Sequence, residues 1–167
     1  MLAVISDTHG MMRPEVLHAL HDCESIIHAG DIGSPEVLDR LTQIAPVHAI
    51  RGNIDTAAWS LSIPEKRTVI WMQQRILIAH RLSDVQAQDL EEIDLLVCGH
   101  SHKPFYGYHL GTRYLNPGSI GPKRFRLPIT CARLYLEDSN VEVAWIVLDD
   151  RGREVRLGPG WDNWVVI

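Results

Sequence analysis

Apolar and polar residues alternate along the first third of the chain in a pattern that predicts alternating strands and helices. Short runs rich in Val, Ile and Ala at residues 2–6, 25–28 and 46–50 indicate buried strands. Two helices are expected between them, over about residues 14–22 and 34–44, because each segment has a proline in its first turn and apolar residues at helical spacing. This β-α-β-α-β order implies a parallel sheet with right-handed crossovers.

Strands dominate the rest of the predicted structure. Residues 68–72 and 75–79 flank Gln73-Gln74 and predict a hairpin, and a helix is expected from about residue 83 to residue 92. Five further strands are expected, at residues 95–97, 112–115, 129–136, 141–148 and 154–157. The pattern predicts an α/β fold in which two facing mixed β-sheets form a sandwich flanked by helices (αββα), as one domain over residues 1–167.

Polar residues follow five of the predicted strands directly. They are Asp7 and His9, Asp31, Asn53, His80, and finally His100 and His102. Each alone is weak evidence, because Asp and Asn often form turns after strands and a strand-end histidine is usually only hydrogen-bonded. In open α/β sheets, however, the carboxyl ends of the strands meet where ligands bind. Oxygen and imidazole donors without thiolate at one such edge predict a metal site.

Composition and charge narrow the classes of partner and of cellular location that the sequence allows. The formal net charge of −5 argues against an extended nucleic-acid footprint, so nucleic acid is not the expected partner. The basic run at residues 123–126 fits a solvated loop better than a contact with a nucleotide backbone, which stays open as an alternative. Cys23, Cys98 and Cys131 are widely spaced, which favours reduced thiols. With no apolar stretch long enough for a membrane and no secretory signal, we expect a cytoplasmic protein.

The ordered set of strand-end motifs resembles the calcineurin-like metallophosphoesterases. The motifs are Asp7-x-His9, Gly30-Asp31, Gly52-Asn53-x-Asp55, the lone His80 and Gly99-His100-Ser101-His102. The short chain and the later Asn116-Pro117-Gly118-Ser119 resemble the small bacterial and archaeal phosphodiesterase branch in particular.

This resemblance implies a site with two divalent metal ions. It assigns Asp7, His9, Asp31 and His102 to one ion, and Asp31, Asn53, His80 and His100 to the other, with Asp31 shared. Manganese is the expected metal, with Fe, Co, Ni and Zn as alternatives. The implied reaction is hydrolysis of a small phosphate ester or nucleotide-type substrate by in-line attack of a metal-bridging hydroxide. Asp31, Asn53 and His100 are the implied catalytic residues, and Asn53 would also contact substrate.

Two positions depart from the family pattern. Larger phosphatases of the superfamily have a histidine after the metal-binding asparagine to protonate the leaving group, whereas this chain has Ile54. Water, Asp55 or His109 would have to supply that proton, so we expect slow turnover of poor leaving groups. Arg81 stands where the family commonly has glycine after the strand-end histidine; it is either a solvated loop residue or a contact to substrate phosphate.

Three other functions remain open at this point. The same ligands would serve a phosphomonoesterase, and a mononuclear hydrolase would result if Asn53 or His80 pointed away. A eukaryotic retromer subunit has this fold with degraded ligands and acts as a binding platform, but all seven ligand positions of this chain are ligand-competent. The apolar tail with Trp161 and Trp164 either covers the chain's own sheet or forms a homodimer contact.

Overall fold

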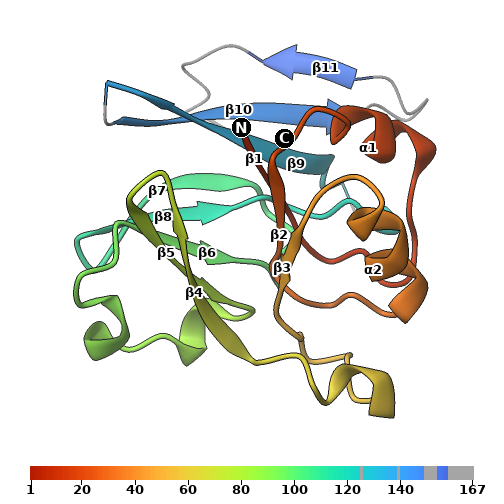
Figure 1. Cartoon of the computed structure of the whole chain (residues 1–167), viewed down its shortest axis with the longest axis horizontal. Coiled ribbons are helices and arrows are strands. Elements are labelled where there is room, and N and C mark those ends of the chain that lie inside the picture. The colour runs from red at the N-terminus through yellow and green to blue at the C-terminus, as the bar shows by residue number, and fades with distance from the viewer. Residues whose placement is uncertain (125, 139, 149–153, 158–167) are drawn as a thin grey trace.

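The computed structural model describes residues 1–124, 126–138, 140–148 and 154–157, and it contains two sheets that lie face to face (Figure 1). The six-stranded sheet has the order β11-β10-β9-β1-β2-β3, and the five-stranded sheet has the order β4-β5-β6-β8-β7. Both mix parallel and antiparallel pairs. This confirms the predicted sandwich of two mixed sheets.

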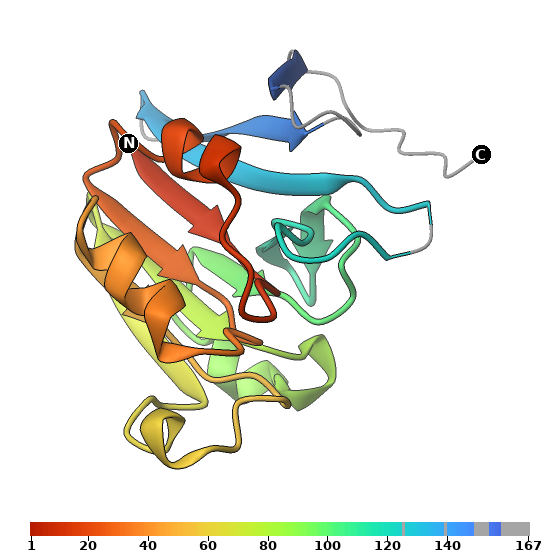
Figure 2. The ribbon, with the colours of Figure 1, turned by 90° about the vertical axis from the view of Figure 1, so that its right-hand side faces the viewer.

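The first sheet is built from the predicted β-α-β-α-β unit and the closing meander. Its strands are β1 (Leu2–Ile5), β2 (Ser25–His28), β3 (Val47–Ala49), β9 (Ile129–Glu137), β10 (Asn140–Leu148) and β11 (Glu154–Leu157). The first three are parallel, and β9 pairs antiparallel with β1. The helices α1 (Pro14–Ala19) and α2 (Pro35–Thr42) cover its outer face, and the arrowheads of β1 and β2 point to one edge of the sheet (Figure 2).

The second sheet carries the remaining strand ends of the site. Its strands are β4 (Lys66–Trp71), β5 (Gln74–Ala79), β6 (Leu95–Cys98), β7 (Phe105–His109) and β8 (Thr112–Asn116). Strands β5, β6 and β8 are parallel. The hairpin between β4 and β5 pairs Trp71 with Gln74, so its turn residues are Met72 and Gln73, both at positive φ (46° and 69°). The sequence pattern therefore placed this turn one residue too far along the chain, at Gln73-Gln74.

Three apolar layers hold the sheets and helices together. Alternate residues of β1 face opposite sides: Ala3 and Ile5 pack under the helices, while Leu2 and Val4 lie between the two sheets. Leu77, Leu96 and neighbouring residues pack against the short turns that cover the outer face of the second sheet. No helix in the described part of the chain could span a membrane, since the longest, α2, has eight residues and a span needs about 20.

Local structure differs from the predicted pattern in three places. The prediction of a helix at residues 83–92 is wrong: the structure has two 3₁₀ turns there, η2 (Leu82–Asp84) and η3 (Ala87–Leu90). The chain becomes extended at Val85, and a capping box between Gln86 and Asp89 starts the second turn afresh. Helix α1 ends at Ala19, and the pattern missed β7 and the short η1 (Ala58–Ser60).

Candidate metal centre

The predicted ligands gather at the carboxyl ends of the strands in two groups of three. Asp7, His9 and His102 form the first triad, and Asp31, His80 and His100 form the second. Within each triad the ligand atoms all lie within 4.8 Å of one another. Six side chains from four separate loops therefore converge at one edge of the two sheets.

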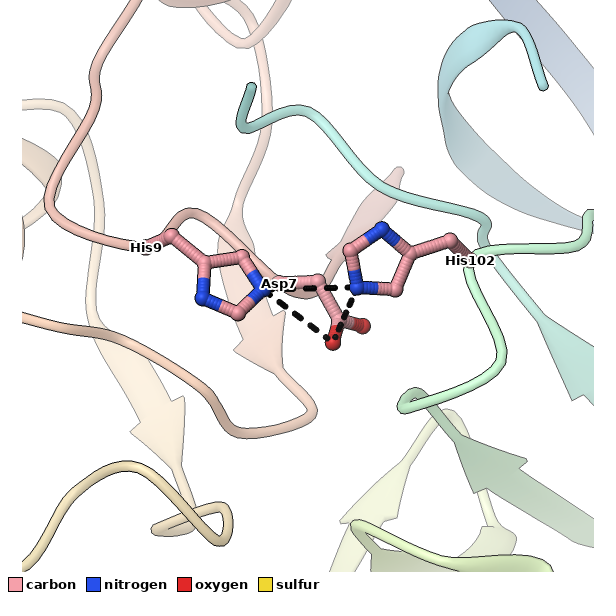
Figure 3. Close-up of side chains that lie close together, drawn as sticks. All are labelled: Asp7, His9 and His102. Carbon is pink, nitrogen blue, oxygen red and sulfur yellow. Dashed lines mark hydrogen bonds and ion pairs between the residues drawn. The ribbon is translucent and has the colours of Figure 1, made fainter. Parts of the chain in front are cut away.

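The side chains of the first triad point toward one another (Figure 3). Nε2 of His102 lies 3.1 Å from Oδ1 of Asp7 and 3.3 Å from Nε2 of His9, and the His9 nitrogen lies 3.9 Å from the same Asp7 oxygen. Asp7 is fully buried and His102 is 4% exposed. Two imidazole nitrogens and a carboxylate oxygen thus point at one small space.

The second triad is joined to the first through Asp31. Its Oδ1 lies 3.2 Å from Nε2 of His80, while its Oδ2 lies 3.9 Å from Nε2 of His9 in the first triad. The ring of His100 stands edge-on to that of His80, with centroids 5.2 Å apart. His100 is exposed, whereas His80 and Asp31 are buried. The two carboxylate oxygens of Asp31 therefore face different triads.

Five of these residues have left-handed backbones. Positive φ angles of 48° to 65° occur at Asp7, His9, Asp31, His100 and His102. Such angles cost a residue with a Cβ roughly 1–3 kcal/mol and persist only where the surrounding structure enforces them. Half of the ten residues other than glycine that have positive φ in the described part of the chain belong to the two triads, so backbone strain is concentrated at this centre.

Two glycines allow the loops to approach one another closely. A Cβ at Gly52 would collide with the amide nitrogen and Oδ1 of Asp31, and one at Gly99 would collide with Oγ of Ser6. The Gly-Asn and Gly-His pairs of the sequence therefore have a steric reason, because only glycine leaves room for the neighbouring carboxylates.

Backbone groups and neighbouring side chains fix the ligands in place. Nδ1 of His80 lies 2.8 Å from the carbonyl oxygen of Ala29, so its Nδ1–H donates there and leaves Nε2 free to bind a metal. Oδ2 of Asp7 accepts the backbone N–H of His100, and Oδ1 of Asp31 accepts that of Ile54.

Asp55 occupies a structural position beside the ligands. Its carboxylate is buried and accepts three backbone N–H groups, from Ile32, Gly33 and Gly52. It thereby ties the loop that follows Asp31 to the loop that carries Asn53. The sequence placed Asp55 near the site as a proton donor; the observed contacts instead suit an acceptor that positions the two loops.

Burial and neighbouring charges set the protonation of the ligands. Burial would raise the pKa of Asp31, but the adjacent His80 outweighs it and holds the pKa at about 2. Burial lowers the pKa of His9 and of His100, and the neighbouring His80 and Arg81 lower the pKa of His100 further. At neutral pH the site therefore presents an ionised carboxylate beside two imidazoles with available lone pairs.

Two pockets flank the second triad. One, of about 560 Å³, is lined by His100, His109 and Arg81, among others. The other, of about 500 Å³, is lined by Asn53, His80 and, again, Arg81. The four sequence-predicted residues outside the two triads therefore lie in or next to the site: Asn53, Asp55, Arg81 and His109. Ile54, which follows Asn53, is 42% exposed.

Sequence reasoning missed two contributors. Nη2 of Arg124 lies 3.3 Å from Nε2 of His9, so the basic run brings a cation to the first triad. Asn116 donates to the carbonyl of Gly99 and to Oγ of Ser101, which supports the loop between His100 and His102. The sequence signal that could have pointed to Asn116 is its place at the start of an Asn-Pro-Gly-Ser turn. Phe125, in the same basic run, and the tryptophans of the tail lie outside the described residues.

The sequence matches one family model and two archaeal relatives whose descriptions agree with it. Residues 1–139 match the model of the calcineurin-like phosphoesterase superfamily domain. A probable metallophosphoesterase from Methanothermobacter thermautotrophicus is 34% identical over 134 residues, covering 71% of this chain and 76% of that protein. One from Methanocaldococcus jannaschii is 33% identical over 153 residues, covering 83% and 77%.

Solved structures share the fold at lower identity. Vps29 from Chaetomium thermophilum has a TM-score of 0.78 at 18% identity, covering 93% of this chain and 94% of its own. Vps29 from Entamoeba histolytica in complex with Zn²⁺ has a TM-score of 0.74 at 23% identity, and the Escherichia coli phosphoesterase YfcE has 0.64 at 23%. Both cover 93% of this chain and 97% of their own. The fold, the ordered motifs and the family match agree, and the chain belongs to the calcineurin-like phosphoesterase superfamily.

Proposed function

We propose that this protein is a dinuclear metal-dependent phosphodiesterase. The observation that carries the proposal is the position of Asp31, whose two carboxylate oxygens face the two triads separately. A carboxylate in that position suits a ligand shared between two ions, and paired ions suit in-line displacement at phosphorus.

The donor set fits two divalent ions. Oδ1 of Asp7 and Nε2 of His80 are buried and have no hydrogen-bond partner among the described residues, which is expensive unless a cation completes the site. Asp7, His9, His102 and Asp31 would hold one ion, and Asp31, His80, His100 and Asn53 the other. When bound, the ions supply charge neutralisation for the phosphoryl group and lower the pKa of bound water. Nitrogen and oxygen donors without sulfur suit manganese, and Fe, Co, Ni and Zn as well.

The chain's own cations and amides would bind and orient the ester. Arg81 and Asn53 line the walls beside the second triad, and Arg124 adjoins the first. Guanidinium groups match the oxygens of a phosphate in pairs, so Arg81 is suited to hold the substrate phosphate. Two pockets on either side of Arg81 give each ester arm its own space, which favours a diester over a monoester.

Protonation of the leaving oxygen is the weak step of this arrangement. Ile54 cannot donate a proton, and Asp55 is engaged by three backbone N–H groups. His109 and solvent remain, since His109 lines the pocket beside His100. General acid catalysis contributes about 10²–10⁴-fold to a rate, so activated aryl esters should react much faster than alkyl esters.

Metal reconstitution tests the proposal. Metal-stripped protein supplied with Mn²⁺ should hydrolyse bis(4-nitrophenyl) phosphate faster than 4-nitrophenyl phosphate, and Asp31→Asn should abolish the activity. Glu24→Gln serves as a control, because Glu24 is an exposed acid whose ion pair is with the chain's amino terminus. Full activity of Asp31→Asn, or no activity of the native protein with any divalent ion, would overturn the proposal.

Two other functions lead to different results in the same experiment. A phosphomonoesterase would prefer the mono-aryl ester. A binding module without activity, which the fold likeness to Vps29 proteins favours, would hydrolyse neither ester in any metal. The complete set of seven ligand-competent residues supports the enzyme.

A further inference from the structure

The larger of the two pockets beside the second triad has an aromatic wall. His100 lines it, and so do Phe105, Tyr108 and His109 from β7 and Tyr114 from β8. Strand β7 is the edge strand of its sheet, and Phe105 and Tyr108 on it are exposed. The pocket therefore joins aromatic surface directly to a metal-ligating side chain.

The rings form a layered surface with open faces. Tyr114 is buried at the base, with the Phe105 ring tilted over it at a centroid distance of 5.3 Å and the His109 ring edge-on at 6.2 Å. Phe105 remains 47% exposed and Tyr108 73% exposed. A Cβ at Gly107 would lie only 2.7 Å from Cζ of Phe105, so glycine at this position lets the ring lie across the strand. This arrangement leaves a site where a flat ring can stack.

Cations border the aromatic wall on the side of the metal centre. Lys103 lines the same pocket, and Arg81 lines both this pocket and the smaller one. The smaller pocket differs in character, since Arg51, Glu65, Lys66 and Asp84 give it charged walls. An ester whose phosphorus lay at the second triad would therefore extend one arm over aromatic rings and the other among charged groups.

We propose that the aromatic pocket binds the nucleobase of a nucleotide phosphodiester substrate. Aromatic side chains beside cations recognise bases by stacking while the cations hold the phosphate, and stacking tolerates any base. The inference rests on the proposed phosphodiesterase activity and specifies its substrate class. Tyr108 and Phe105 are the specificity-determining residues, and the charged pocket takes the second, polar arm.

Binding to the full chain without metal tests this inference independently of catalysis. Adenosine 5′-monophosphate and ribose 5-phosphate differ only in the base, and isothermal titration calorimetry compares their affinities. We expect the nucleotide to bind at least about tenfold more tightly. Tyr108→Ala and Phe105→Ala should each reduce that ratio about fivefold or more. Equal affinities of the two ligands, or ratios unchanged in both variants, would overturn the inference.

The matched control is Ile70→Ala. Ile70 is 77% exposed on β4, at the opposite edge of the same sheet, and lines neither pocket. Its removal should leave the affinity ratio unchanged. If the exposed rings served a protein contact instead, Tyr108→Ala would behave as Ile70→Ala does towards both ligands, which counts against a base site.

Kinetics with Mn²⁺ then separate this inference from the proposed function. Thymidine 5′-(4-nitrophenyl phosphate) and methyl 4-nitrophenyl phosphate share a leaving group and differ in the other arm. We expect a kcat/KM ratio of at least about ten in favour of the nucleotide, and a fall in that ratio in Tyr108→Ala. Hydrolysis of both esters at equal kcat/KM would overturn the base site and leave the phosphodiesterase standing. Hydrolysis of neither would overturn the proposed activity, and calorimetry would still decide the base site.

Discussion

The two triads of the candidate metal centre, called its two halves below, differ in how far they are closed to solvent. In the first triad, Asp7 is fully buried and His102 is 4% exposed, and Ser119 donates a hydrogen bond to the carbonyl oxygen of Asp7 behind it. In the second, His100 is exposed and two pockets open beside it. The first half is thus held by the core of the fold, whereas the second faces the space a substrate would fill.

This difference teaches where changes should affect folding and where they should affect chemistry. In the first triad Asp7 and His102 are buried, so each contributes to packing as well as to metal binding. In the second triad His100 borders solvent, so its loss leaves no enclosed cavity. Substitutions in the two halves should therefore separate stability from activity.

The largest effect is expected from removing one histidine of either half. His102→Ala and His100→Ala should each lower phosphodiesterase kcat by about 100-fold or more, because each removes one ion from the pair. Elemental analysis of the reconstituted protein should show one metal per chain in each variant in place of two. In metal-free protein, only His102→Ala should lower the melting temperature appreciably. Equal melting temperatures for the two variants would contradict the contrast between the halves.

Removal of Asp55 should weaken the loops under the second half. Asp55→Ala leaves three backbone N–H groups, one of them buried and two partly buried, without their acceptor, which should cost about 2–4 kcal/mol of unfolding free energy. Urea denaturation measures the loss. Asp39→Ala, a change at an exposed acid on α2, is the control. A loss below about 0.5 kcal/mol in Asp55→Ala would mean that water replaces the carboxylate.

A smaller effect is expected where this chain lacks a proton donor. Ile54→His places an imidazole at a position that is 42% exposed beside the second triad. The kcat for an alkyl ester should rise about tenfold or more, while that for bis(4-nitrophenyl) phosphate should change little, because nitrophenolate needs no proton to leave. Ile54→Gln controls for polarity alone. An equal rise on both esters would point to altered binding instead of proton transfer.

Much of the fold and most of the site could be predicted because the relevant signals are local. Buried parallel strands appear as short apolar runs, and a polar residue directly after such a run lies at the ligand-binding edge. All seven candidate ligands were found at or near strand ends in this way, and the family resemblance assigned their roles. The resemblance also divided them between two ions, but the left-handed backbones of five of them needed the structure.

The elements that were missed depend on contacts distant in sequence. Strand β7 has no alternation of apolar and polar residues, since its exposed rings face a pocket and solvent. Residues 83–92 have helical spacing, but the chain has to cover the second sheet, and two 3₁₀ turns do so. Arg124 comes to His9 from 115 positions away, and nothing in a basic run predicts that contact.

The smallest expected effect concerns His28, which lies behind the first half. Nε2 of its ring lies 2.9 Å from Oγ1 of Thr8, whose hydroxyl donates to the carbonyl of Ile32, so the ring N–H donates to Thr8. Nδ1 has no partner among the described residues, and the side chain is fully buried. Burial therefore lowers the pKa of His28 to about 4, because a proton on Nδ1 would bring an unpaired charge into the core.

The lowered pKa makes stability depend on pH in a defined direction. Between about pH 6.5 and pH 4 the unfolded chain binds a proton at His28 that the folded chain does not, so the free energy of unfolding falls as pH falls. From pH 7 to pH 5.5 the loss should be about 1 kcal/mol. His28→Gln keeps a donor and cannot titrate, so the variant's loss should be smaller by that amount in urea denaturation of metal-free protein. The other histidines titrate in both proteins and cancel in the comparison, so equal losses would show that His28 is accessible to protons in the folded state.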